Sequence, residues 1–196
     1  MNAERQFSIL FVCTGNICRS PLSEQLLRRS INTPDIVTYS AGTSAMVGEP
    51  MPHIQQDIAK KLGIENPENH RGQQLTAEHI ERADLILVME RAHRSIVVQQ
   101  APRSLRRTFT FRELARISEV VPDEDLAFDS DRLVDRLKVL VEAASINRGI
   151  AVPLETPEED DIVDPYKRSK QIYLESRDQI VGTLTTVAHY LNRAAG

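Results

Sequence analysis

Residues 12–21, VCTGNICRSP, bring together the side-chain types that phosphate chemistry requires. Cys13 supplies a thiol, and Arg19 follows six positions later, close enough for a loop to turn its guanidinium back toward the sulfur. A planar guanidinium binds two oxygens of one phosphate, a grip that a lysine ammonium does not reproduce. The hydroxyl of Ser20 is a hydrogen-bond donor for the same sulfur. This spacing indicates a nucleophilic cysteine beside an oxyanion clamp.

The elements expected on either side of these residues support that interpretation. Residues 7–12, FSILFV, form an apolar run that predicts a strand buried on both faces. Pro21 suits the first position of a helix, and Ser20 is then its cap. The N–H groups of such a loop can surround an anion, and the helix end stabilises both a phosphate and a thiolate. With Gly15 providing a tight turn, the pattern predicts an oxyanion-binding catalytic loop rather than an inert buried thiol.

Further along the chain, strand and helix patterns alternate. Short apolar runs predict strands at residues 36–39, 85–89 and 108–111. Apolar residues at three- and four-residue steps predict helices at 54–62, 76–82, 92–100 and 169–192. Strands that alternate with helices form parallel sheets with helices on both faces. We therefore expect a three-layer α/β/α fold with a four-stranded parallel sheet, in which the phosphate-binding loop joins the first strand to the first helix.

The length of 196 residues suits a single domain, residues 1–196. Residues 120–161 differ in character from the units before them. They contain a helical pattern at 133–141 and the acidic run ETPEEDD at 155–161. We interpret this stretch as a helical insertion, and its acidic run as a solvated loop.

Composition excludes several classes of function. A formal charge of −4 and a pI near 5.8 provide no general attraction to nucleic acid or to anionic lipid. No run approaches the roughly 20 apolar residues of a membrane span, and the first residues lack the pattern of a secretory signal, so we expect a cytoplasmic protein. The five histidines show no zinc-ligand spacing, and the two cysteines lie in one motif. Neither a metal nor another cofactor is expected.

Residues 13–21, CTGNICRSP, resemble the signature of the low-molecular-weight protein tyrosine phosphatase family. The resemblance continues at residues 40–43 (SAGT), 70–71 (HR), 83–89 (ADLILVM) and 164–166 (DPY). It implies a four-stranded parallel sheet flanked by helices, in agreement with the strands expected above. It also implies metal-independent hydrolysis of a phosphate monoester through a cysteinyl-phosphate intermediate.

The resemblance assigns roles to individual residues. Cys13 is the nucleophile, Arg19 binds the phosphate, and Asp164 is the general acid and then the general base. A residue of that kind is needed chemically, because a poor leaving group must be protonated and a water must then be deprotonated. The alternative for Asp164 is that it only turns the chain together with Pro165. The implied phosphate-binding set is Thr14, Gly15, Asn16, Ile17, Cys18, Arg19 and Ser20.

Other residues are implied to support this loop or to contact the substrate. Ser40 and His70 correspond to a hydrogen-bond network that also includes Asn16 and Ser20. Tyr166 corresponds to an aromatic wall of the substrate pocket, with simple packing as its alternative, and Met46 lies where relatives often carry an aromatic wall.

The resemblance also points to a substrate. Ile17 is implied to face the pocket at a position where relatives that act on phosphoarginine tend to carry threonine. We therefore expect a protein tyrosine phosphatase, whose partner is a phosphotyrosine-containing protein and whose candidate partner kinase is a tyrosine kinase. Two alternatives remain: an arsenate reductase of the same fold that uses an external low-molecular-weight thiol, and a catalytically silent module that binds phosphoproteins.

Overall fold

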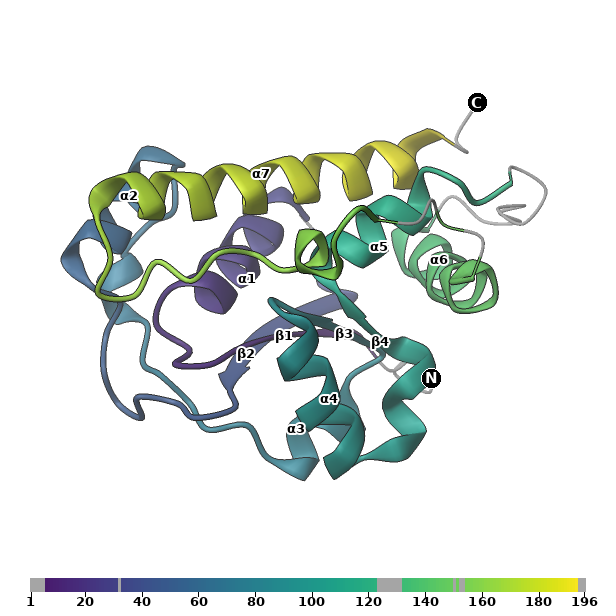
Figure 1. Ribbon diagram of the computed structural model, residues 1–196, viewed down its shortest axis with the longest axis horizontal. Coiled ribbons are helices and arrows are strands. Elements are labelled where there is room, and N and C mark those ends of the chain that lie inside the picture. The colour runs from purple at the N-terminus through teal and green to yellow at the C-terminus, as the bar shows by residue number, and fades with distance from the viewer. Residues whose placement is uncertain (1–5, 32, 123–131, 150, 152–153, 194–196) are drawn as a thin grey trace.

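Four parallel strands form the centre of the computed structural model (Figure 1). The structure describes residues 6–31, 33–122, 132–149, 151 and 154–193. The strands are β1 Phe7–Cys13, β2 Ile36–Gly42, β3 Leu85–Val88 and β4 Thr108–Thr110. Their order in the sheet is β2-β1-β3-β4, so β1 lies inside the sheet and pairs with β2 along its whole length. The expected α/β fold with a four-stranded parallel sheet is confirmed.

Helices cover both faces of this sheet (Figure 1). On one face lie α1 Arg19–Ser30, α5 Phe111–Ser118, α6 Leu133–Asn147 and the long α7 Lys170–Arg193, with α2 His53–Lys61 packed against α7. On the other face lie α3 Ala77–Arg82 and α4 Arg91–Gln100. Short 3-10 turns are η1 Pro67–Asn69, η2 Pro102–Arg107 and η4 Pro157–Asp160. No helix in the described part of the chain is long and apolar enough to cross a membrane.

Alternation along β1 places Cys13 on a defined face of the sheet. Leu10 and Val12 belong to the apolar cluster on the α3 and α4 side. Ile9, Phe11 and Cys13 belong to the cluster on the α1 and α7 side. Side chains on both faces are almost fully buried, as the apolar run predicted. Burial of each large side chain stabilises the fold by about 1.5–3 kcal/mol. The strand therefore holds Cys13, its last residue, in a fixed position.

Most predicted boundaries differ from the structure by one to three residues, and two of the differences change how the elements are capped. Helix α1 begins at Arg19, and Cys18 is its N-terminal flanking residue without a side-chain cap, so Ser20 lies inside the helix rather than capping it. Strand β4 ends at Thr110, and Phe111 is the first residue of α5, a helix that the sequence analysis did not predict. The Glu113 N–H donates to the Thr110 hydroxyl at 2.9 Å, a capping box that the T-x-x-E spacing could have indicated.

The expected helix in the second half of the chain is α6. Its buried side chains Val134, Leu137 and Leu140 join the same apolar cluster as α1 and α7. Residues 123–131, 150 and 152–153 of this stretch lie outside the described residues. That residues 120–161 are an insertion in one domain therefore stays a proposal.

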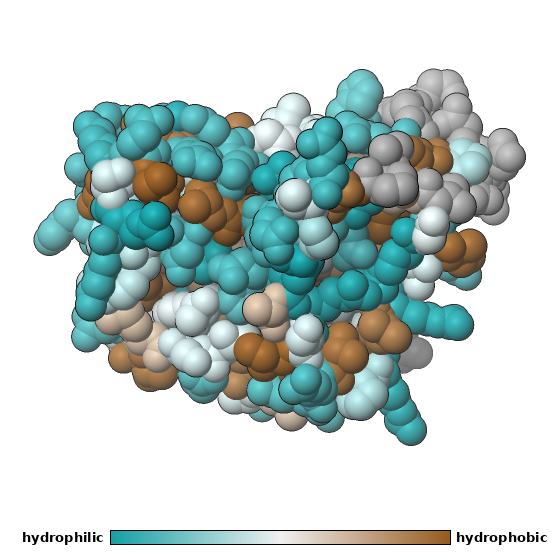
Figure 2. Space-filling view, viewed as in Figure 1, coloured by the Kyte–Doolittle hydropathy of each residue, from teal (hydrophilic) through white to brown (hydrophobic). Residues whose placement is uncertain are grey.

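The acidic run at 155–161 was predicted to be a solvated loop; residues 155–159 are exposed, but the prediction is wrong for the last two residues. Asp160 forms an ion pair with Arg116 of α5, and Asp161 forms one with Arg91 of α4. The segment that follows crosses the front of the molecule to reach α7 (Figure 1), over a face that is mainly hydrophilic (Figure 2). Like charges in the run are tolerated because arginines from two helices neutralise them.

A close approach between β2 and the loop after Cys13 can be tested at Gly42. A Cβ atom there would lie 2.4 Å from the Thr14 carbonyl oxygen, so backbone would have to move. We expect Gly42→Ala to lower the free energy of unfolding by about 1–3 kcal/mol in urea titrations. Gly182→Ala in α7 is the control, because a Cβ there would meet no atom within 4 Å other than neighbouring backbone of its own helix, and alanine favours a helix. This change should stabilise the protein by about 0.5–1 kcal/mol. Equal effects of the two changes would contradict this packing account.

Candidate active site

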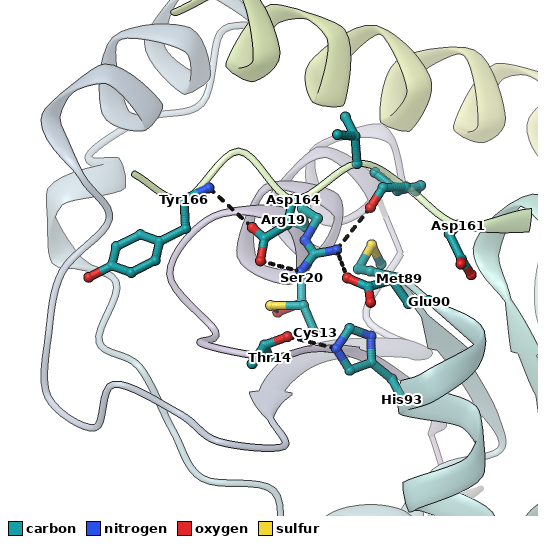
Figure 3. Close-up of polar contacts among 12 residues, drawn as sticks. Cys13, Thr14, Arg19, Ser20, Met89, Glu90, His93, Asp161, Asp164 and Tyr166 are labelled. Carbon is teal, nitrogen blue, oxygen red and sulfur yellow. Dashed lines mark hydrogen bonds and ion pairs between the residues drawn. The ribbon is translucent and has the colours of Figure 1, made fainter. Parts of the chain in front are cut away.

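A cavity of about 130 Å³ lies where β1 ends, and three distant segments line it. The loop between β1 and α1 contributes Cys13, Thr14, Gly15, Ile17, Cys18 and Arg19. Ser44 and Met46 come from the segment after β2. Asp164 and Tyr166 come from the segment before α7. The fold therefore joins the predicted nucleophile, phosphate clamp, general acid and substrate walls around one space (Figure 3).

The Cys13 sulfur is buried at the base of this cavity and has two hydrogen-bonding neighbours. The Ser20 hydroxyl lies 3.0 Å from the sulfur, and the Asn16 backbone N–H donates to it over 3.2 Å. Both groups can donate to a thiolate. The N–H groups of Gly15, Ile17 and Cys18 have no acceptor among the described residues. They are available as donors to an oxyanion.

Asn16 sets the shape of the loop. Its φ is 54°, in the left-handed region, which costs a non-glycine residue about 1–2 kcal/mol. Its side-chain amide donates to the Ser20 and Ser40 hydroxyls, each at 2.9 Å, and its side-chain oxygen accepts the Gln73 N–H at 2.8 Å. Its backbone oxygen lies 2.6 Å from His70 Nε2. These contacts hold the strained residue in place, and Gly15, to which we had assigned the turn, does not have a positive φ.

Ser40 and His70 support Asn16 from behind the loop. The Ser40 hydroxyl donates to Glu24 over 2.5 Å, and Glu24 also pairs with Arg28. Burial lowers the pKa of His70, so its ring is neutral at pH 7, and Nε2 must carry its proton because the Asn16 carbonyl only accepts. Both residues line a second cavity of about 760 Å³, which contains no cysteine. Size alone would favour that cavity, but the reactive side chains line the smaller one.

Arg19 is 1% exposed, and its guanidinium meets two carboxylates and a carbonyl (Figure 3). It forms an ion pair with Glu90, donates to the Ile162 carbonyl over 2.8 Å, and pairs with Asp164 at 2.9 Å. Its Nε has no partner among the described residues. Burial by itself would lower the pKa of Arg19, but the charges of Cys13, Asp164 and Glu90 raise it. The guanidinium is thus a fixed positive charge beside the sulfur.

Asp164 lies at the open side of the cavity. Its side chain is 44% exposed, one oxygen pairs with Arg19, and the other accepts the Tyr166 N–H at 3.1 Å. Tyr166 lines the cavity itself, and the Lys167 ammonium lies 5.2 Å from the centre of its ring. The carboxyl is therefore placed between the buried guanidinium and solvent.

Glu90 and His93 belong to this site and were missed by the sequence analysis. His93 is 3% exposed, and its Nε2 lies 2.9 Å from the Thr14 hydroxyl. Burial lowers its pKa to about 4, so the ring is neutral at pH 7. Both residues follow β3 at its carboxyl end, the edge at which parallel sheets bind ligands. That position was a signal in the sequence which could have indicated them.

The predicted site residues thus lie around the cavity or directly behind its loop, while their roles stay predictions. Cys18 lines the cavity, but burial raises the pKa of its thiol to about 12, so Cys18 remains protonated. Within the described residues, no group of three or more His, Cys, Asp or Glu side chains could hold a metal ion.

Comparison with known proteins identifies a family whose matched region includes the loop after β1. The family model described as low molecular weight phosphotyrosine protein phosphatase matches residues 8–124, which run from β1 past α5. The chain belongs to this family. Its family members include a low molecular weight protein-tyrosine-phosphatase, Etp, from Escherichia coli, 41% identical over 116 residues, or 59% of this chain and 76% of Etp.

A second relative of this chain is named for a different substrate. The protein-arginine-phosphatase of Geobacillus stearothermophilus is 37% identical over 107 residues, which cover 55% of this chain and 70% of the relative. The solved structure of the YwlE arginine phosphatase from the same organism aligns with a TM-score of 0.66 at 27% identity, covering 95% of this chain and 94% of that one. Family membership establishes a phosphatase of this class, and tyrosine and arginine phosphatases both occur among its relatives.

The neutral, buried His93 gives stability a pH dependence. Its pKa is about 4 in the folded protein and 6.5 when solvated, so between these values the unfolded chain takes up a proton that the folded protein does not. The free energy of unfolding should therefore fall as the pH drops from 7 to 4.5, by about 2 kcal/mol from this group.

Urea titrations of the wild type and of His93→Asn at both pH values check this. The difference in unfolding free energy between the two proteins should shrink at pH 4.5. His53→Asn, at an exposed position, is the control. A difference that is independent of pH would show that His93 is not held neutral.

Proposed function

We propose that this phosphatase hydrolyses phosphotyrosine in protein substrates through a cysteinyl-phosphate intermediate. One observation carries the proposal: the Cys13 sulfur, the Arg19 guanidinium and the Asp164 carboxyl face one cavity of about 130 Å³. A nucleophile, an oxyanion clamp and a proton donor within one space are the three groups that this chemistry needs.

In the first step the Cys13 thiolate attacks phosphorus, and an S–P bond forms as the P–O bond to the substrate breaks. The Ser20 hydroxyl and the Asn16 N–H, 3.0 and 3.2 Å from the sulfur, stabilise the thiolate before attack. Asp164 gives its proton to the departing oxygen, so the leaving group is a neutral phenol. This donation requires the carboxyl to be protonated when the substrate binds.

Charge on the transferring phosphoryl group is stabilised by Arg19 and the loop amides. Arg19 Nε is unpartnered among the described residues, so it can bind an equatorial oxygen while Glu90 keeps hold of the same guanidinium. The N–H groups of Gly15, Ile17 and Cys18 supply further donors. Because these donors are already in place, little reorganisation is needed as charge develops.

In the second step water attacks the phosphocysteine. The Asp164 carboxylate accepts a proton from that water, the S–P bond breaks, and inorganic phosphate leaves. The Ser20 hydroxyl at 3.0 Å stabilises the thiolate that departs. The cycle then closes: the proton that Asp164 accepts from water is the one that it donates in the next first step, and the sulfur is again a thiolate.

The cavity walls favour an aromatic substrate. Ile17, Met46 and Tyr166 line it with apolar and aromatic surface. These side chains would pack on the ring of a phosphotyrosine, whereas the guanidinium of phosphoarginine would find Asp164 as its one acidic partner among the lining residues. A phosphotyrosine-containing protein is the substrate that fits these walls, and a tyrosine kinase is the candidate partner that would produce it.

Side-by-side assays test the proposal. The purified protein should hydrolyse p-nitrophenyl phosphate and phosphotyrosine peptides in the presence of a chelator, and kcat/KM for a phosphotyrosine peptide should exceed that for its phosphoarginine analogue. Cys13→Ser should lower turnover by at least about 10³-fold, because a hydroxyl is rarely ionised at pH 7. Cys18→Ser is the matched comparison and should keep part of the activity.

Other outcomes would decide between the alternatives. A higher kcat/KM for phosphoarginine would reassign the substrate within the family. Arsenate reduction that depends on an added low-molecular-weight thiol, without hydrolysis of aryl phosphates, would indicate a reductase. Phosphopeptide binding without turnover by the wild type would indicate a binding module.

The role of Asp164 has its own signature. Asp164→Ala should lower kcat/KM for phenyl phosphate by about 10²–10³-fold and for p-nitrophenyl phosphate by much less, because the poorer leaving group depends more on protonation. Asp57→Ala, at an exposed position on α2, is the control. Equal losses on the two esters would contradict general-acid catalysis by Asp164.

A further inference from the structure

The segment that carries Asp164 is attached to the start of α4 by an unusual cap. Glu90 is the N-terminal flanking residue of α4, yet its side chain does not cap the helix, because it pairs with Arg19. The N–H of Arg91, the first residue of α4, instead donates over 2.7 Å to Asp161. Asp161, which is distant in the sequence, thus accepts a hydrogen bond from the first N–H of α4 in place of a neighbouring side chain. The Glu90 carboxylate is therefore available to pair with Arg19.

The same carboxylate is held by the side chain of Arg91. The guanidinium Nε lies 3.3 Å from each oxygen of Asp161, and a terminal nitrogen lies 3.1 Å from one of them. That nitrogen also donates to Glu158 over 2.8 Å. Including the backbone N–H, one residue of α4 makes four hydrogen bonds to Asp161. Such a bidentate arrangement fixes orientation as well as distance.

A second arginine holds the neighbouring residue. Arg116 of α5 contacts Asp160 at 2.9 and 3.4 Å, and both side chains are mostly buried. Two helices on opposite faces of the sheet therefore grip adjacent carboxylates. We name Arg91, Arg116, Asp160 and Asp161 the acid-loop anchor.

Little freedom remains between this anchor and Asp164 (Figure 3). The Ile162 N–H donates to the Met89 carbonyl over 2.8 Å, and the Ile162 carbonyl accepts from Arg19 over 2.8 Å. The Val163 N–H donates to Gln179 of α7 over 2.9 Å. Each residue from 160 to 163 is thus tied to a different part of the fold. Asp164 is the next residue.

We propose that Asp161 and Arg91 are positioning residues for the proposed general acid: their ion pair sets where the Asp164 carboxyl meets the leaving oxygen. The inference rests on the proposed function. The Asp164 side chain is partly exposed, and it pairs with Arg19 and accepts the Tyr166 N–H, so its position also depends on the segment before it. Proton transfer requires hydrogen-bond reach, and a displacement of about 1 Å costs on the order of 10²-fold in rate.

The experiment measures kcat/KM for phenyl, 4-chlorophenyl and p-nitrophenyl phosphates, and its dependence on leaving-group pKa. Asp161→Ala should lower kcat/KM for phenyl phosphate about ten- to hundredfold and should steepen the dependence toward that of Asp164→Ala. Arg91→Gln keeps the backbone bond and should show a smaller change in the same direction, and Arg91→Lys should recover part of it. Glu155→Ala, an exposed acid of the same run, should match the wild type.

A double substitution separates positioning from general damage. If Asp161 acts through Asp164, then Asp161→Ala in the Asp164→Ala background should change kcat/KM by less than about twofold. Thermal melts accompany every variant, and partly exposed ion pairs contribute little to stability. If Asp161→Ala does not fold, Arg91→Gln in the same two backgrounds replaces it.

The outcomes distinguish the inference from the proposed function. Three results would each overturn the positioning role. Folded Asp161→Ala could keep the wild-type dependence of kcat/KM on leaving-group pKa, or it could lose activity equally on all three esters. The third is a further large loss of kcat/KM when Asp161→Ala is added to Asp164→Ala. If Asp164→Ala itself leaves the dependence unchanged, the proposed general acid is wrong. Failure of the wild type to hydrolyse any aryl phosphate would refute the proposed function and the inference together.

Discussion

The buried charge of Arg19 is the constraint around which the site is organised. An unpaired guanidinium at 1% exposure would cost several kcal/mol, so the fold must supply anionic and carbonyl partners. They come from Glu90 after β3 and from Ile162 and Asp164 before α7, all far along the chain. The surroundings of the Arg19 guanidinium are therefore complete only when the whole sheet and the segment before α7 have folded. The same contacts place the Asp164 carboxyl at the cavity that Cys13 also lines.

A second cost is local strain, and hydrogen bonds offset it. Asn16 occupies the left-handed region, and its polar groups are bound by Ser20, Ser40, Gln73 and His70. These contacts hold the loop open around the sulfur before any oxyanion arrives. Donors that are already oriented stabilise a transition state without reorganisation, which is why strain at such a site is retained.

Different acidic residues pair with the active-site arginine and cap the helix that begins beside it. Glu90 lies where a helix cap is expected, but it pairs with Arg19, and Asp161 satisfies the helix in its place. Asp160 and Asp161 appear in the sequence as part of a charged run, which is usually solvated. Here arginines on α4 and α5 form ion pairs with both residues, and these ion pairs attach the segment that carries Asp164 to the two helices.

Sequence alone determined the local features of this protein: the buried run of β1, the order of the strands and of the helices other than α5, and the spacing of Cys13, Arg19 and Ser20 in one loop. These follow from periodicity and residue type, which act over a few residues. Tertiary structure decided the rest. That Asn16 rather than Gly15 takes the strained conformation, that Glu90 and His93 join the site, and that Asp161 caps α4 all depend on contacts between distant segments. Such contacts leave no periodic signal, because each partner is chosen by where the sheet places it and by the cost of burying an unpaired charge.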